Sequence, residues 1–179
     1  MKPNIVTKFA IASEEGVEII KHLTRTIAKE KFEALIPSEM LDNYINEELN
    51  DKKLIDDLNE SLTTQWLVVY KNDQPAGYAR ITSKGERPVV EEKSIISIAD
   101  FGVLQEYNEP EVLQSLLDKC YYICKIYQAV WLHEYKENPL LFFFEANKFK
   151  RMNQESDSYG LLPLPSVFMI REKEEIIPK

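Results

Sequence analysis

The stretch 94-SIISIADFGVLQEYNEPEVLQSLLDKC-120 joins an apolar run to an amphipathic pattern through a short acidic turn. Residues 94–104 predict a strand, and residues 110–127 carry apolar side chains at helical spacing. A strand that runs into a helix N-terminus often binds phosphate, because free N–H groups and the helix dipole point outward there. This turn contains three glutamates, a proline and no glycine. It is therefore either an altered phosphate site or only a well-capped helix, in which Asn108 caps and Pro110 occupies the first turn.

Outward from this stretch, the clearest pattern is a hairpin over residues 63–84, whose turn "KNDQP" carries Asn and Asp. The order of elements predicts one α/β (α+β) domain over residues 1–179, with a mixed sheet and helices on both faces. The other expected strands lie at 4–12, 129–135 and 161–173, and the other expected helices at 13–32, 37–62 (broken near 50–51) and 138–152.

Composition narrows the classes of partner. The chain has 179 residues, a hydrophobic fraction of 44% and a net charge of −8. An acidic chain without a basic run argues against nucleic acid and anionic membranes as partners. The first residues lack the apolar core and cleavage site of a signal peptide, so the expected location is the cytoplasm. Cys120 and Cys124 are expected to be reduced core thiols, and His22 and His133 are too far apart in sequence to suggest a metal site.

Three stretches resemble the GCN5-related N-acetyltransferase (GNAT) superfamily. The first, "FEALIPSEMLDNYINEELNDKKLIDDLNESLTTQWLVVYKNDQPAGYARI", is similar to the family's opening helices and hairpin. The second, "FGVLQEYNEPEVLQSLLDKC", is similar to the acyl-CoA segment, and the third, "WLHEYKENPLLFFFEANKFKRM", to the following strand and helix. Together they span most of residues 4–172. The resemblance implies a mostly antiparallel sheet and a divergent N-acetyltransferase that moves an acyl group from acetyl-CoA, or another acyl-CoA, to an amine acceptor.

The resemblance also implies where CoA binds. The pantetheine arm would pair with the backbone of Gly102, Val103 and Leu104, in a gap between the strands Ile98–Leu104 and Ala129–Tyr135. The pyrophosphate would lie on the following turn, which departs from the family's pattern. Glutamates beside a pyrophosphate set like charge against like, at a cost on the order of 2–4 kcal/mol for each close pair. The departures are Asn108 for Gln or Arg, Glu109, Glu111 and Leu113 for glycines, and Pro110, which lacks an N–H.

The last helix of the family carries two further cofactor contacts. The asparagine that caps it corresponds to Asn138, one position off. The tyrosine that protonates the leaving thiolate corresponds to Phe144, whose ring cannot donate a proton.

Three residues are candidates for catalysis. Asp100 lies two residues before Gly102 on the same face of a strand, where a general base would be placed. His133 and Tyr135 share a face of the next strand, where His133 would serve as a base and Tyr135 would replace the missing tyrosine. The alternatives are a paired acid at a strand end and a half-buried histidine. Trp66 and Tyr78 either line the acceptor site or belong to the core.

Two functions therefore remain open. The first is the N-acyltransferase with a small-molecule or peptide amine as acceptor. The second is a catalytically inactive domain of the same fold that binds a ligand or a protein, which the altered turn and Phe144 favour. A homodimer formed through an edge strand at "LLPLPSVFMI" is a third possibility, limited by its prolines.

Overall fold

We describe the protein from a computed structural model, which describes residues 2–85, 87, 88, 90 and 93–173. In these residues seven strands form one sheet in the order β1-β2-β3-β4-β5-β7-β6. All neighbouring pairs are antiparallel except β4 and β5. The strands are β1 (Ile5–Phe9), β2 (Thr64–Lys71), β3 (Gln74–Thr82), β4 (Ile95–Val103), β5 (Ala129–Tyr135), β6 (Lys150–Ser156) and β7 (Ser166–Glu172).

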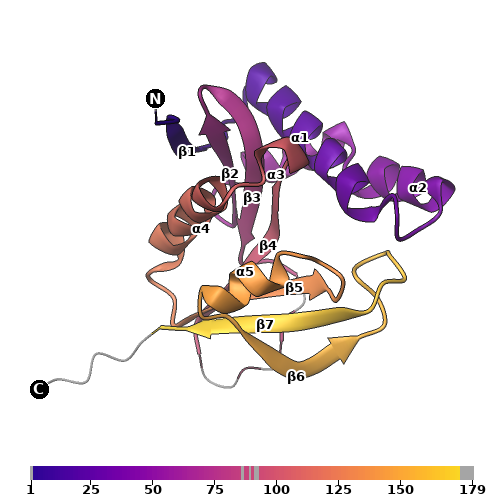
Figure 1. Cartoon of the computed structure of the whole chain (residues 1–179), viewed down its shortest axis with the longest axis vertical. Coiled ribbons are helices and arrows are strands. Elements are labelled where there is room, and N and C mark those ends of the chain that lie inside the picture. The colour runs from indigo at the N-terminus through magenta and orange to yellow at the C-terminus, as the bar shows by residue number, and fades with distance from the viewer. Residues whose placement is uncertain (1, 86, 89, 91–92, 174–179) are drawn as a thin grey trace, which may run out of the picture.

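Helices cover both faces of this sheet, as predicted (Figure 1). Helices α4 and α5 lie on one face, where the largest core cluster forms, and α1, α2 and α3 lie on the other. The helices are α1 (Glu14–Phe32), α2 (Ser38–Glu48), α3 (Asp51–Asn59), α4 (Pro110–Cys124) and α5 (Leu141–Ala146), with a 3-10 turn at Gln105–Tyr107. None of the helices in the described residues is long and apolar enough to cross a membrane.

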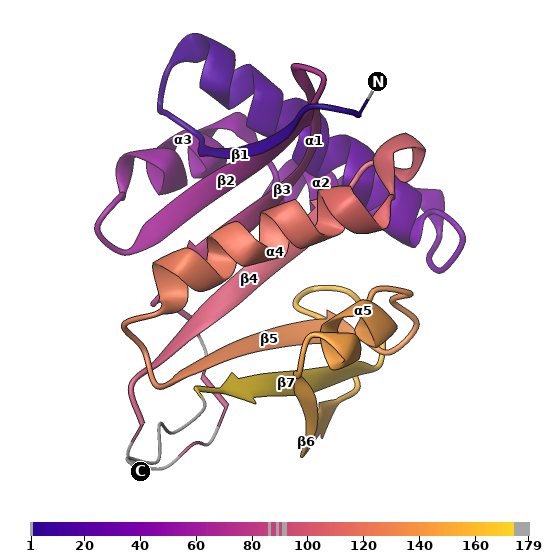
Figure 2. The same ribbon diagram turned by 60° about the vertical axis from the view of Figure 1, so that its left-hand side comes forward.

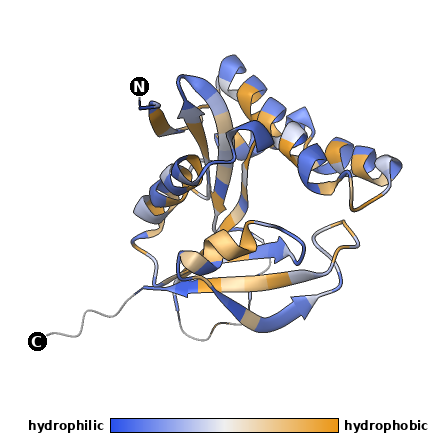
Figure 3. Cartoon of the chain, in the orientation of Figure 1, coloured by the Kyte–Doolittle hydropathy of each residue, from blue (hydrophilic) through white to orange (hydrophobic). Residues whose placement is uncertain are grey.

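Local sequence explains several of these elements. Ser13 caps α1 by accepting a hydrogen bond from the Gly16 N–H at 3.0 Å. Asn72 and Asp73 both adopt positive φ angles, 49° and 64°, which the tight turn between β2 and β3 requires. Figure 3 shows hydrophilic and hydrophobic residues alternating along α1 and α4, as expected for helices with one face against a sheet. The two cysteines are free and buried, as predicted.

The parallel pair β4 and β5 separates along its length. The two strands are paired only from Ile95 with Ala129 to Ser97 with Trp131. Beyond that point β4 continues to Val103 and β5 to Tyr135, and Figure 2 shows the two strands diverging. The pairing of β4 with β3 also shifts register beside Asp100, so that β4 carries one extra residue there. The predicted separation of these strands is confirmed.

Two predictions near the C-terminus are wrong. The helix expected over 138–152 ends at Ala146, because Lys148 adopts a φ of 70° and turns the chain into β6. Strand β6 then pairs with β7. Since β7 lies between β5 and β6, the segment proposed as a free edge for dimer formation is an inner strand.

Candidate functional site

A cleft of about 270 Å³ opens where β4 and β5 separate. Its walls come from the second half of α1, the end of β4, the turn before α4 and the segment between β5 and α5. Of the residues predicted to contact a cofactor, Gly102, Val103, Asn108 and Asn138 line it. Predicted contacts from the β4–α4 segment and from the segment before α5 therefore meet at one cavity.

The backbone of β4 is only partly available to a ligand in this cleft. The Leu104 N–H donates to the Ala76 carbonyl at 2.8 Å, so it is directed toward β3 and the prediction that it pairs with pantetheine is wrong. Because successive residues of a strand direct their backbone groups to opposite edges, Gly102 also points toward β3, whereas Phe101 and Val103 point toward the cleft. Gly102 instead allows α1 to pack closely against β4, since a Cβ atom there would lie 2.6 Å from Cγ2 of Ile27.

Lys31 reaches from α1 into the cleft. Its Nζ donates to the Phe101 carbonyl at 2.9 Å and lies 3.5 Å from Oδ1 of Asp100. The Lys31 side chain is only 12% exposed. The ammonium group therefore occupies one of the two backbone positions of β4 that face the cleft.

Asp100 lies on the same face of β4 as Gly102, because Lys31 adjoins both residues. Its carboxylate also accepts hydrogen bonds from the Tyr78 hydroxyl at 2.5 Å and from the Phe101 N–H at 2.9 Å. Burial and the Asp100 charge raise the pKa of Tyr78 well above its usual value. Asp100 is thus a paired acid next to the cleft, and its role as a base stays a prediction.

Glu134 is a buried acid on the other side of the separation. It is 2% exposed, and its Oε2 accepts a hydrogen bond from Nδ2 of Asn138 at 2.7 Å. Burial raises its pKa to about 7, although the Lys31 charge and the Asn138 bond oppose that shift. The Oδ1 of Asn138 accepts from the Leu140 N–H at 2.9 Å, so this amide orders the segment that leads into α5.

The turn before α4 uses most of its N–H groups internally. Those of Tyr107, Asn108 and Glu109 donate to carbonyls within the turn, and those of Val112 and Leu113 donate to Glu109. The Gln105 N–H donates to Oε2 of Glu30 at 2.9 Å. The Glu30 carboxylate thus already accepts a hydrogen bond from the backbone of this turn.

The helix start partly matches its predicted form. Pro110 occupies the first turn of α4 as predicted, but the N-cap is Glu109 rather than Asn108, and no side chain caps it. Glu109 instead pairs with Lys71, at 2.5 Å from Nζ to Oε1. The turn is therefore a stable helix start without a glycine cradle.

The remaining predicted site residues lie in three different environments. Phe144 is fully buried, with its ring centre 5.3 Å from that of Phe101, so the prediction that it contacts a cofactor is wrong. Tyr135 lines the cleft, and burial raises its pKa, which makes it a weak proton donor. His133 shares its face, as predicted, but lines a different cavity, stacks on Phe168 and hydrogen-bonds Ser166 Oγ at 2.6 Å. The three catalytic candidates do not line a common cavity.

A second cavity, of about 390 Å³, lies beside Asp100 and carries more acid than base. Trp66 contributes to its wall, under the guanidinium of Arg80 at 5.7 Å from the ring. Its charged lining comprises Glu48, Asp56, Asp57 and Asp100 against Lys53 and Arg80. The Lys31–Asp100 ion pair joins a residue of the cleft to a residue of this cavity, which places the two cavities next to each other.

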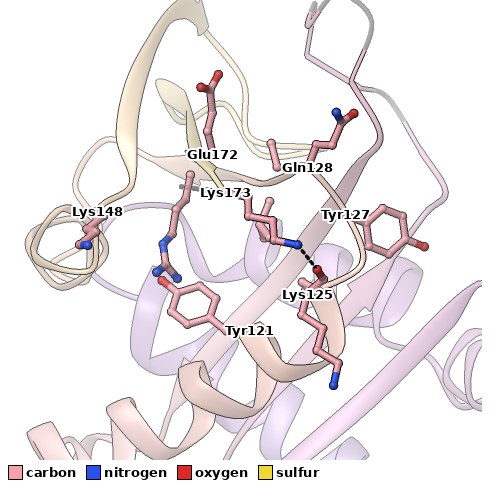
Figure 4. A pocket seen from close by; sticks show the side chains of 11 residues that line it. Tyr121, Lys125, Tyr127, Gln128, Lys148, Glu172 and Lys173 are labelled. Carbon is pink, nitrogen blue, oxygen red and sulfur yellow. Dashed lines mark hydrogen bonds between the residues drawn. The ribbon is translucent and has the colours of Figure 1, made fainter. Parts of the chain in front are cut away.

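A third cavity, shown in Figure 4, lies at the opposite end of β5 beside Ala129 and Val130. Its cations are engaged with the protein: Nζ of Lys173 donates to the Lys125 carbonyl at 3.2 Å, and the Arg171 guanidinium lies 3.8 Å from the ring centre of Tyr121. Since it begins where β4 and β5 are still paired, it does not extend the cleft.

The sequence patterns missed Lys31, Glu30 and Glu134. The first two lie near the end of a regular amphipathic helix, where a charged residue is ordinary. Glu134 did leave a signal, because it is an acid in a strand whose neighbours are almost all apolar and buried.

Comparison with solved structures identifies the fold. A paiA N-acetyltransferase from Thermoplasma acidophilum, crystallised with coenzyme A, superposes with a TM-score of 0.73 at 16% identity, over 97% of this chain and 100% of that chain. The chain has the GNAT fold. A GCN5-related N-acetyltransferase from Rhodopseudomonas palustris gives a TM-score of 0.67 at 12% identity, over 97% of each chain.

Other proteins with the GNAT fold differ in their described activity. FeeM, an N-acyl amino acid synthase from uncultured soil microbes, matches with a TM-score of 0.65 at 10% identity, over 96% of this chain and 92% of that chain. No family model and no curated protein matches the sequence. The predicted fold is therefore confirmed by structure, whereas the sequence is only 10–16% identical to these three proteins.

Proposed function

We propose that this protein is an acyl-CoA-dependent N-acyltransferase. The pantetheine arm of acetyl-CoA, or of another acyl-CoA, enters the cleft between β4 and β5. The observation that carries this proposal is the end of the β4–β5 pairing at Ser97 and Trp131, beyond which the cleft-facing backbone of Val103 lines a cavity. A solved structure of the same fold holds coenzyme A.

The acceptor is a small-molecule or peptide amine in the acidic cavity beside Asp100. Its nitrogen attacks the thioester carbon, the C–S bond breaks, and CoA leaves as a thiolate. Asp100 lies between this cavity and the cleft, so it is the carboxylate placed to take the proton of the amine. Three of the four acids in this cavity form ion pairs with Lys53, Arg80 or Lys31, so the excess negative charge that would favour a cationic acceptor comes from the fourth, Asp56.

One observation favours the second candidate, an inactive domain that binds a ligand or a protein. The N–H groups of the turn are largely used, and Glu30 occupies the Gln105 N–H that a pyrophosphate would otherwise meet. An acyl-CoA would then be held chiefly through its pantetheine arm, with its phosphates in solvent.

A thermal-shift titration followed by a thiol-release assay separates these candidates. We expect acetyl-CoA to raise the melting temperature, because a ligand that binds only the folded state stabilises it by mass action. We also expect a panel of amines to release CoA. Binding without release for any amine would favour the inactive domain, and the absence of both would reject the cleft as an acyl-CoA site.

A further inference from the structure

We propose that Lys31 is the group that stabilises the thiolate of departing CoA. This inference rests on the proposed function and assigns a role that the sequence left vacant. The resemblance implied a tyrosine as proton donor to the thiolate. Phe144 occupies the position of that tyrosine and is fully buried in the core.

The position of Lys31 carries this proposal. Among the residues that line the cleft, Lys31 is the only cation. Its Nζ is 2.9 Å from the Phe101 carbonyl and 3.5 Å from where a Cβ atom on Gly102 would lie. A pantetheine arm that pairs with the cleft-facing edge of β4 therefore passes directly beside the ammonium group.

The chemistry of the step requires such a group. When the amide C–N bond forms and the C–S bond breaks, the electron pair of that bond remains on sulfur. An ammonium N–H can pair with this thiolate and transfer a proton to it, which yields neutral thiol and a neutral lysine that regains a proton from water. Tyr135, the other proton donor at the cleft, is weakened because burial raises its pKa.

Several acids lie around Lys31, and one of them, Asp100, forms an ion pair with it. Asp100 of β4 lies within 3.5 Å, and Glu134 of β5 is within its electrostatic reach. Glu30 on the same helix and Glu137 after β5 also line the cleft. When pantetheine takes the Phe101 carbonyl, Lys31 loses that acceptor, and a donor becomes available for sulfur while the ion pair with Asp100 remains.

The test compares the binding of CoA with that of desulfo-CoA, which lacks the sulfur, by calorimetry between about pH 7 and about pH 10, a range that brackets an ordinary thiol. For the wild-type protein we expect the preference for CoA over desulfo-CoA to increase by up to about ten-fold across this range, which corresponds to a thiol pKa lowered by about one unit. Lys31→Met should abolish the increase and Lys31→Arg should keep it. Lys29→Met, an exposed change of the same charge on the same helix, should leave it intact.

The outcomes are distinct. If neither compound binds the wild-type protein, the proposed function fails, and this inference with it. If both bind and Lys31→Met shows the same pH-dependent preference as the wild type, the function stands and Lys31 has no such role. Should Lys31→Met not fold, the ultraviolet absorbance of the thiolate in the wild-type complex decides, because a bound thiol with the pKa of free CoA overturns the inference.

Discussion

Glu134 is a buried carboxylic acid whose pKa is set by opposing effects. Burial raises its pKa to about 7, while the Lys31 charge and the Asn138 hydrogen bond oppose the shift. A carboxyl group with a raised pKa in the folded state stabilises the fold fully below its unfolded pKa, about 4.3, and this contribution is lost as the pH rises through the folded value. Glu134 therefore makes the protein less stable at neutral pH than in mild acid.

Glu134→Gln should remove this pH dependence. A glutamine oxygen can still accept the Asn138 bond, but the side chain no longer ionises. Relative to the variant, we expect the wild-type free energy of unfolding to fall by on the order of 2–3 kcal/mol between about pH 4.5 and about pH 7.5. Denaturant unfolding over this range measures it, with the exposed Glu137→Gln as a control that should follow the wild type. Parallel profiles for wild type and Glu134→Gln would refute the buried-acid account.

The turn between β4 and α4 satisfies most of its backbone hydrogen bonds within the protein. Five of its N–H groups donate to carbonyls of the same segment, and Pro110 has none to offer. The side chain of Glu30 then accepts from Gln105. The turn is thus stabilised by its own hydrogen bonds, without a ligand and without a glycine.

Glu30→Gln should strengthen the binding of acetyl-CoA. The amide oxygen keeps the hydrogen bond from Gln105, while the negative charge that would repel a pyrophosphate approaching this turn is removed. We expect a gain of about three- to five-fold in affinity at low ionic strength, declining as salt screens the charges. Calorimetry at two salt concentrations tests this, and Glu33→Gln, an exposed change of the same charge at the C-cap of α1, should have little effect. Unchanged or weaker binding by Glu30→Gln would show that the pyrophosphate does not approach this turn.

For the whole molecule, the sequence predicted what depends on local pattern and order. The hairpin at Asn72 and Asp73, the cap at Ser13 and the separation of β4 from β5 follow from turn chemistry, helix signals and family resemblance. Strand β6 was missed because Phe149, which packs in the core after the left-handed turn at Lys148, continues an apolar run that reads as helix.

The site was harder to predict from the sequence than the fold was. The cleft depends on contacts between segments far apart in the chain, such as Lys31 with the Phe101 carbonyl and Glu30 with the Gln105 N–H. No local pattern encodes these pairs. The direction of the Leu104 N–H likewise depends on its pairing with Ala76 of β3, which a strand pattern alone does not specify.

The central claim is that an acyl-CoA binds where β4 and β5 separate. Isothermal titration of acetyl-CoA into the wild-type protein and into Gly102→Val tests it most directly, because even a Cβ atom at Gly102 would lie 2.6 Å from Ile27. We predict saturable binding to the wild type, a loss of at least about ten-fold in Gly102→Val as bulk enters a packed site, and no change in Lys173→Met at the cavity of Figure 4. Thermal melting confirms that each variant is folded. Equal affinity of wild type and a folded Gly102→Val, or no binding to the wild type, would contradict the account.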